Sequence, residues 1–98
     1  MQTREEYICY LKEAIEYYKT AEYQQQAGLY REEAADIKDI YKKQAIWKKY
    51  LDPNKNKIGE LFKKYQTNKM QVVETGMKYD QEPEVSALVL EMAKYAIK

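Results

Sequence analysis

The sequence repeats one pattern of residue types: an aromatic residue, two lysines and a second aromatic residue. It occurs at residues 47–50 (WKKY) and again at residues 62–65 (FKKY). Lysines neutralise phosphates or pair with carboxylates, and aromatic rings supply large contact areas. The pattern therefore fits a surface that grips nucleic acid or an acidic protein. It also fits two amphipathic helices whose rings face a core and whose lysines face water.

Helical periodicity favours the second interpretation. At 100° per residue, Phe62 and Tyr65 share a face with the neighbouring apolar residues, whereas Lys63 and Lys64 project to the flanks. Trp47 likewise shares a face with the isoleucines that precede it. We therefore predict that the repeat is mainly a product of amphipathic helices.

Charge is unevenly distributed along the chain. Residues 42–69 hold nine basic and two acidic side chains, a net +7, whereas residues 1–41 carry −4 and residues 70–98 carry −2. A segment with this excess of positive charge favours binding of an acidic partner. Its cations are all lysines, which lack the fork by which arginine reads bases, so a protein partner is favoured over specific nucleic-acid reading. The candidate partner-binding residues of this block are Lys48, Lys49, Tyr50, Lys63, Lys64 and Tyr65.

Groups that carry catalysis are scarce. The chain has no histidine, and Cys9 therefore lacks a histidine that would activate its thiol. The carboxylate pairs Glu5 with Glu6 and Glu32 with Glu33 are expected on exposed helix turns, where solvated charges are the ordinary case. Three isolated glycines form no phosphate loop. We expect no enzymatic activity, no cofactor and no metal.

Composition places the chain in a broad class. Ninety-eight residues with 45% hydrophobic and 34% charged side chains predict one globular domain over residues 1–98. No stretch approaches the roughly 18 apolar residues that span a bilayer, and the first residues lack the apolar run of a signal peptide. A single cysteine suits a reducing compartment. We expect a cytoplasmic protein without a membrane segment.

Apolar residues at helical spacing predict an all-α fold, a small bundle of three or four helices. It begins with an antiparallel hairpin over about residues 3–51. The first helix covers about residues 3–25, with Thr3 in a capping box, and the second covers about residues 30–51. Gly28 supplies the turn between them.

The second half is predicted to begin with a loop at residues 52–57. Helices follow at about residues 58–79 and 83–97, the latter with Pro83 at its first position. The polar stretch QTNK, residues 66–69, leaves open whether the first of these is one helix or two. We favour one continuous helix.

Residues 7–41 include small residues at the expected crossing of the two hairpin helices, Ala14, Ala21 and Ala34, and a Gly-x-Tyr at Gly28 and Tyr30. This segment resembles the helical hairpin of tetratricopeptide repeats and of microtubule-interacting-and-trafficking domains. The chain has no second copy at the period of about 34 residues that a repeat array requires. The resemblance implies binding of a peptide or protein through a helical groove.

An alternative interpretation concerns residues 57–79. If QTNK is a break, this segment looks like a helix-turn-helix, in which Thr67 caps a recognition helix. Asn68, Lys69 and Gln71 would then face base edges. Nucleic-acid binding through the basic segment, residues 42–69, is the corresponding partner prediction.

The last predicted helix has apolar residues around more of its circumference than one core contact needs. Leu90 and Tyr95 are therefore further candidate partner-binding residues, and we predict a homodimer or a tight complex with another protein. We predict the role of a small adaptor, accessory subunit or inhibitor. Fifteen lysines to two arginines are typical of an A/T-rich bacterial genome or its phages, so an inhibitor of a host defence or polymerase system fits.

Overall fold

The computed structural model describes residues 3–96, and every regular element in that range is helical. The all-α prediction is confirmed, but the predicted three or four helices are six α-helices within the described range. In chain order these are α1 (Arg4–Tyr18), α2 (Ala21–Ala34), α3 (Ile40–Tyr50), α4 (Lys55–Lys64), α5 (Lys69–Tyr79) and α6 (Pro83–Tyr95), with a 3-10 turn η1 (Asp52–Asn54) before α4.

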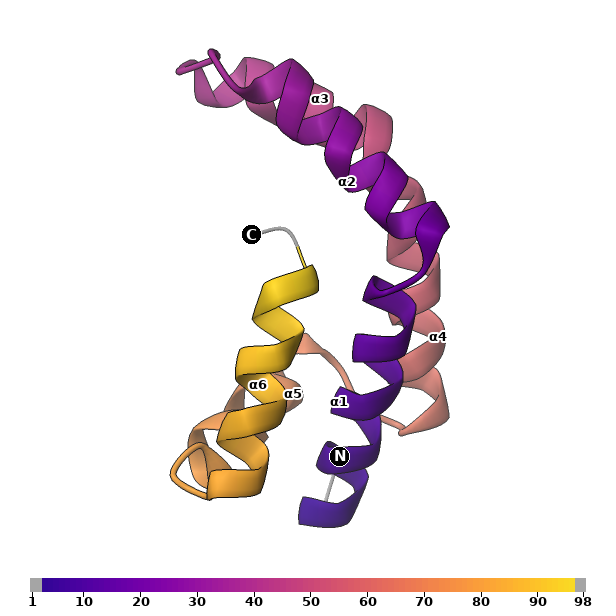
Figure 1. The fold of residues 1–98 in the computed structure, drawn as a ribbon. Coiled ribbons are helices and arrows are strands. Elements are labelled where there is room, and N and C mark those ends of the chain that lie inside the picture. Colours follow the sequence, from indigo (N-terminus) through magenta and orange to yellow (C-terminus); the bar gives the residue numbers. More distant parts are fainter. Residues whose placement is uncertain (1–2, 97–98) are drawn as a thin grey trace.

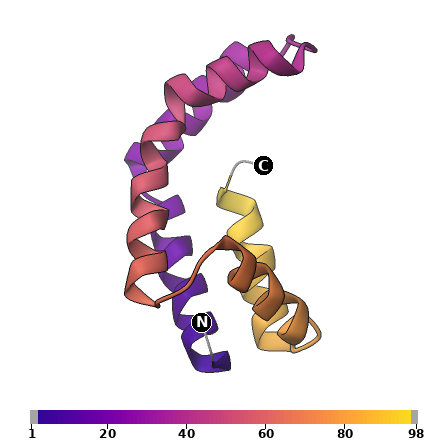
Figure 2. The ribbon, with the colours of Figure 1, turned by 180° about the vertical axis from the view of Figure 1, so that it is seen from behind.

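Helix α1 is the centre of a four-helix body. Helices α4, α5 and α6 all pack against it. Figures 1 and 2 show α4 on one side of α1 and the α5–α6 pair on the other. We call these four helices the body.

Helices α2 and α3 form an antiparallel pair that projects beyond the body, and we call this pair the arm (Figure 1). The molecule measures 40 × 26 × 25 Å and has a radius of gyration of 14.6 Å. A compact domain of this length has a radius of gyration of about 13 Å. The projecting arm accounts for this elongation.

Two separate clusters of buried residues hold these parts. The body cluster joins α1 to α6 through Tyr7, Ile8, Tyr10, Leu11 and Val85, with partly buried residues of α4 and α5 packed around it. The arm cluster is smaller, with Tyr23, Ala27 and Leu51 buried and four tyrosines and a tryptophan packed against them. The apolar residues are therefore not pooled in one core.

The predicted first helix is in fact two helices that meet at residues 19–20. Thr20 is the N-cap of α2, and its hydroxyl accepts a hydrogen bond from the backbone N–H of Tyr23 (3.3 Å). Gly28, predicted as a turn, lies inside α2, and a Cβ placed there would meet no atom within 4 Å. The prediction was wrong because a continuous apolar stripe hid the cap and a glycine was taken as a stop signal.

The turn between α2 and α3 lies at residues 35–39, so the predicted helix over residues 30–51 is also wrong. Asp39 is the N-cap of α3, and its carboxylate accepts from the backbone N–H groups of Tyr41 (2.8 Å) and Lys42 (3.3 Å). An aspartate at this position satisfies N–H groups that the first helical turn leaves unpaired.

The segment predicted as one helix over residues 58–79 is also two. Gln66 adopts a φ of 50°, and the N–H groups of Thr67 and Gln66 donate to the carbonyls of Phe62 (2.8 Å) and Lys63 (3.2 Å). This pair of bonds is a Schellman motif, which ends α4. Its left-handed position is usually a glycine, and the glutamine there explains why the stop was missed.

The remaining boundaries are closer to prediction. The predicted loop at residues 52–57 is shorter, because η1 occupies its start and α4 already begins at Lys55. Thr3 caps α1 through the N–H of Glu6 (3.1 Å), and Pro83 is the first residue of α6, as predicted. The predicted end of the last helix at residue 97 lies outside the described residues.

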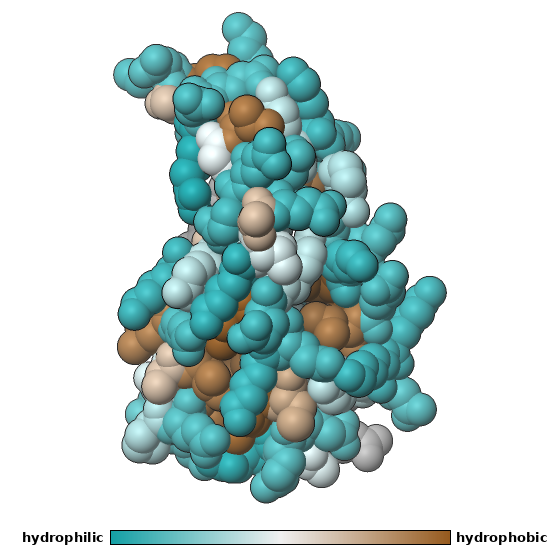
Figure 3. All heavy atoms as spheres, turned by 45° about the vertical axis from the view of Figure 1, so that its right-hand side comes forward, coloured by the Kyte–Doolittle hydropathy of each residue, from teal (hydrophilic) through white to brown (hydrophobic). Residues whose placement is uncertain are grey.

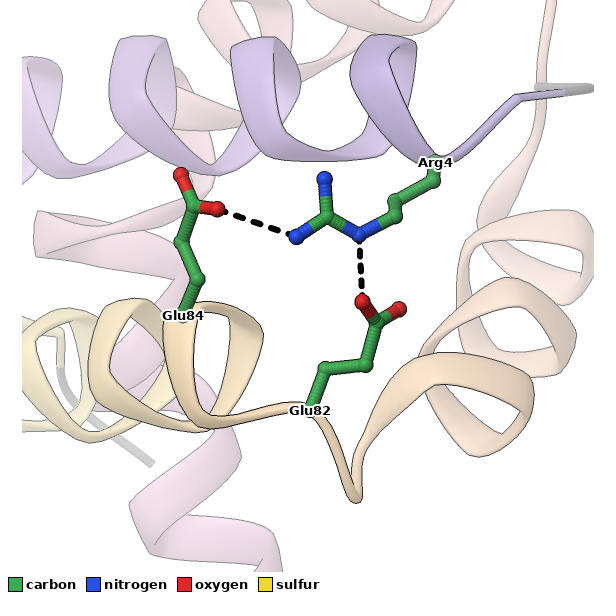
Figure 4. Close-up of polar contacts among 3 residues, drawn as sticks. All are labelled: Arg4, Glu82 and Glu84. Carbon is green, nitrogen blue, oxygen red and sulfur yellow. Dashed lines mark hydrogen bonds and ion pairs between the residues drawn. The ribbon is translucent and has the colours of Figure 1, made fainter.

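Polar contacts fix α6 to α1. Arg4 at the start of α1 reaches two carboxylates at the start of α6, with its Nε 2.5 Å from Glu82 and its Nη2 2.9 Å from Glu84 (Figure 4). Further along, Lys19 pairs with Glu91 at 3.1 Å. These pairs add to the buried apolar contact between α1 and α6.

Candidate interaction surface

The repeated aromatic-Lys-Lys pattern is a product of amphipathic helices, as predicted. Trp47 meets Tyr30 edge to face at 5.4 Å between ring centroids, and Phe62 stacks on Tyr10 at 6.0 Å. All four aromatic residues of the two repeats are half-buried. The lysines between them, Lys48, Lys49, Lys63 and Lys64, are exposed.

The four lysines do not gather into one cationic patch. The first pair ends α3 and the second ends α4, a helix of ten residues that is about 15 Å long. Lys49 pairs with Glu33 (3.7 Å) and Lys64 with Glu13 (2.5 Å), whereas Lys48 and Lys63 have no ion pair among the described residues. On the face in Figure 3, hydrophilic side chains cover most of the upper part. The positive charge is spread along the chain and partly neutralised.

Tyr65 belongs to a structural contact between α4 and α1. Its hydroxyl donates a hydrogen bond to the Glu13 carboxylate, which also accepts from Lys64. These two hydrogen bonds lower the pKa of Glu13, and burial together with the carboxylate raises the pKa of Tyr65. Tyr65 and Lys64 therefore already have partners within the chain.

The two candidates on α6 differ in their surroundings. Leu90 is 64% exposed, so its side chain lies on the outer side of α6. Tyr95 is half-buried, with Lys19 Nζ 5.3 Å from its ring centroid and its carbonyl accepting from Gln24 (3.0 Å). A partner can therefore contact more of the Leu90 side chain than of the Tyr95 side chain.

Residues 67–71 are largely occupied with one another. Asn68, rather than the predicted Thr67, is the N-cap of α5, and its Oδ1 accepts from the N–H of Gln71 (3.0 Å). The Thr67 hydroxyl contacts the Gln71 side chain at 3.0 Å. Lys69 is exposed and has no ion pair among the residues described. Helices α4 and α5 do not pack closely against each other as the two helices of a helix-turn-helix do. Both line a groove.

This groove was not predicted from the sequence. Its lining comes from α1, from α4 and α5, and from the base of the arm. Its volume is about 650 Å³. The lining residues are Tyr10, Tyr17, Tyr18, Tyr23, Trp47, Leu51, Asn54, Lys55, Ile58, Gly59, Phe62, Lys69, Val72 and Val73.

The polar groups that line the groove include amide, hydroxyl and ammonium groups but no carboxylate. Asn54 Oδ1 accepts from the Tyr17 hydroxyl, but its Nδ2 is buried without a hydrogen-bond partner. Lys55 and Lys69 are the charged residues of the lining, and no carboxylate is among them. Burial raises the pKa of Tyr10 and of Tyr17 to about 12, so both hydroxyls stay neutral at physiological pH. The groove therefore presents apolar rings, hydrogen-bond donors and positive charge.

An apolar stripe on α5 continues from the groove. Met70, Val73 and Met77 follow one another at helical spacing and are 71%, 53% and 71% exposed. Val73 belongs to both the groove and the stripe. The opposite face of α5 packs on the body cluster through Val72 and Tyr79. The sequence does contain an indication of this exposed stripe, because α5 has apolar residues on two of its faces. The body covers only one of these faces.

Comparison with protein-family models, with curated proteins and with solved structures finds no match to this chain. Among residues 3–96, no three His, Cys, Asp or Glu side chains lie close enough together to hold a metal ion. The described helices also include none with the length and apolarity needed to cross a membrane.

Proposed function

We propose that this chain is a non-enzymatic protein-interaction module, an adaptor, accessory subunit or inhibitor. The observation that carries the proposal is the α5 stripe of Met70, Val73 and Met77, apolar residues that are more than half exposed beside a groove. Contiguous apolar surface on a small protein marks an interaction site, and methionine side chains adapt to a partner's shape.

The total surface supports the same proposal. The accessible surface is 7039 Å², whereas a compact monomer of 11.8 kDa exposes about 5,900 Å². A partner that lies against the concave side would cover part of this excess. An inhibitor from a phage or mobile element fits the lysine-rich composition.

The partner is either another protein or a second copy of this chain. Leu90 on α6 is exposed and would extend an interface beyond α5. A homodimer through this surface is tested by light scattering over a range of concentrations. A mass that doubles with concentration, and stays monomeric for Leu90→Glu, would identify a second copy as the partner.

The direct test is capture from the native host with tagged full-length chain, followed by mass spectrometry. We expect proteins that wild type retains and that Met70→Glu/Met77→Glu loses, because two carboxylates on the stripe oppose burial in an interface. Gln25→Glu/Gln44→Glu makes the same charge change at exposed positions of the arm and should retain the same proteins. The proposal would be contradicted if the chain were monomeric at every concentration and if both double variants retained the same proteins as wild type.

Nucleic-acid binding through residues 42–69, with Thr67, Asn68, Lys69 and Gln71 as contacts, is the alternative. The break between α4 and α5 is the observation that favours it. Binding of random duplex would weaken with salt by about 0.9 log unit per log unit of salt for each phosphate contact. We expect little binding at physiological salt. Micromolar affinity there that Lys63→Glu/Lys64→Glu abolishes would replace the protein partner with nucleic acid.

A further inference from the structure

The composition of the groove specifies the chemistry of its occupant. We propose that the groove binds an acidic, amphipathic peptide segment of a partner protein. An aliphatic or aromatic side chain of that segment enters between the rings, and a carboxylate lies near Lys69, Lys55 and Asn54. This inference rests on the proposed function and names the class of partner.

The rings of the groove favour a side chain over a stacked base. Tyr10 and Phe62 already stack on each other, and Tyr17, Tyr18 and Tyr23 pack together with centroids 4.9–5.5 Å apart. Ring faces that are used within the chain are not available as stacking platforms for nucleotides. The space that remains suits a branched or aromatic side chain that contacts several rings at once.

Asn54 adds a polar group to the lining. Its Oδ1 accepts a hydrogen bond from the Tyr17 hydroxyl, and its Nδ2 is buried without a hydrogen-bond partner. Because Nδ2 has almost no accessible surface, an acceptor oxygen of the peptide reaches it only if neighbouring side chains move aside.

Charge at the groove selects for an anion. Lys55 and Lys69 are the first residues of α4 and α5, so both lysines and the positive ends of two helices adjoin the lining. Lys55 has an intramolecular partner, Asp52 at 3.0 Å, whereas Lys69 has none among the described residues. Lys69 is therefore the principal site for a carboxylate of the peptide.

Gly59 allows the groove to be closed by one substitution. It lies inside α4 on the groove wall, and a Cβ there would meet no atom within 4 Å. Gly59→Leu should fill part of the groove, and leucine also has a higher helix propensity than glycine. Gly28→Leu is the matched control, because Gly28 is also helical and has open space at its Cβ but does not line the groove.

The experiment is selection of random displayed peptides on the purified full-length chain. We expect enrichment of net-negative peptides that contain a large apolar residue. Synthetic copies should bind wild type and Gly28→Leu equally, and Gly59→Leu at least about 10-fold more weakly. Lys69→Glu should weaken binding about 10-fold, a change of about 1.4 kcal/mol. It should not unfold α5, because a carboxylate at a helix N-terminus is favourable.

Asn54→Asp tests the charge of the lining at nearly unchanged shape. Aspartate keeps an acceptor for the Tyr17 hydroxyl and adds a negative charge, so acidic peptides should bind several-fold more weakly at unchanged fold. Helical circular dichroism of each variant confirms folding.

Three outcomes would overturn the inference. These are no enrichment, enrichment of basic peptides, or acidic peptides that bind Gly59→Leu as well as wild type. If Gly59→Leu instead abolishes binding of fluorescent oligo-dT, the groove is a nucleic-acid site. If Gly59→Leu still retains the proteins captured from the host, the proposed function stands and only the assignment of the groove fails.

Discussion

The body and the arm are both helical, but they are stabilised to different degrees. The body cluster draws buried residues from α1 and α6 and packs partly buried residues of α4 and α5 around them. The arm cluster buries only Tyr23, Ala27 and Leu51, and half-buried aromatic residues surround it. A region with fewer buried contacts opens at lower free energy. The difference indicates that the body is the scaffold and the arm the adaptable part.

The long-range ion pairs follow the same division. Among the described residues, Arg4, Lys19 and Glu13 each tie α1 to another helix of the body. The arm has one such pair between its helices, Lys49 with Glu33 at 3.7 Å. The groove lies where the base of the arm meets the body, so a partner there would contact the stable region and the adaptable one together.

The largest expected effect comes from one substitution made in each region. Leu11→Ala removes a side chain that is 1% exposed from the body cluster and should lower the free energy of unfolding by about 3–5 kcal/mol. Leu51→Ala in the arm cluster should cost about 2 kcal/mol, because its half-buried neighbours can close around the cavity. Urea denaturation monitored by circular dichroism measures both.

Hydrogen exchange sharpens this comparison. In Leu51→Ala, faster exchange should be confined to α2 and α3, whereas Leu11→Ala should accelerate exchange throughout the chain. Equal losses of stability with equal spread of exchange would mean that the body and the arm unfold as one unit.

The second expected effect concerns alkaline pH and Tyr10 of the body cluster. Burial raises the pKa of Tyr10 to about 12 from an ordinary value of 10.0. The unfolded chain therefore ionises first, so the stabilisation is complete below pH 10 and is lost as pH rises from 10 to 12. The loss attributable to Tyr10 should reach about 2 kcal/mol near pH 12. Tyr10→Phe should be less sensitive over that range, and an unchanged pH dependence of its unfolding would argue against the burial of this hydroxyl.

Helical content and several helix ends could be predicted from the sequence. Apolar spacing is a local property of the chain, and Thr3 and Pro83 act through neighbouring backbone groups. The breaks at Thr20 and Gln66 were missed for a different reason. Each interrupts a stripe that continues on the next helix, and the glutamine occupies a left-handed position where a glycine is expected.

The groove could not be predicted from periodicity alone. It depends on how far apart α4 and α5 are held by α1, which is a tertiary property of side chains such as Tyr10 and Phe62. The prediction of lysines 48, 49, 63 and 64 as partner-binding residues rests on the local excess of positive charge. A count of charges does not show that Lys49 and Lys64 already form ion pairs within the chain. Lys69, which the sequence predicts as a nucleic-acid contact, lines the groove.

A third prediction tests the packing that positions α5 on α1. A Cβ at Gly76 would lie 2.8 Å from the Tyr7 hydroxyl oxygen, which is too close, and 3.5 Å from its Cζ, which is acceptable. Gly76→Ala should therefore destabilise the body by about 1 kcal/mol, since strain exceeds the gain in helix propensity. Tyr7→Phe removes the clashing atom, so Gly76→Ala/Tyr7→Phe should be more stable than Gly76→Ala.

Thermal unfolding of the two single variants and the double variant gives the coupling. Strictly additive effects would show that α5 does not approach α1 so closely. The arm offers a control, because Gly28 has open space at its Cβ and Gly28→Ala should stabilise the chain by up to about 1 kcal/mol.

The smallest expected effect concerns the exposed ion pairs of the two regions. Arg4→Gln breaks both ion pairs in Figure 4, yet these side chains are partly exposed, so the loss of unfolding free energy should be small. Lys49→Gln in the arm should change the free energy of unfolding even less, because its pair is longer and more exposed. Both differences from wild type should shrink at high salt, which screens exposed charges. Urea denaturation at low and high salt measures them. A loss for Arg4→Gln that persists in high salt would show that Arg4 stabilises the body by packing its stem against α6, and the contrast between body and arm would then extend to the surface.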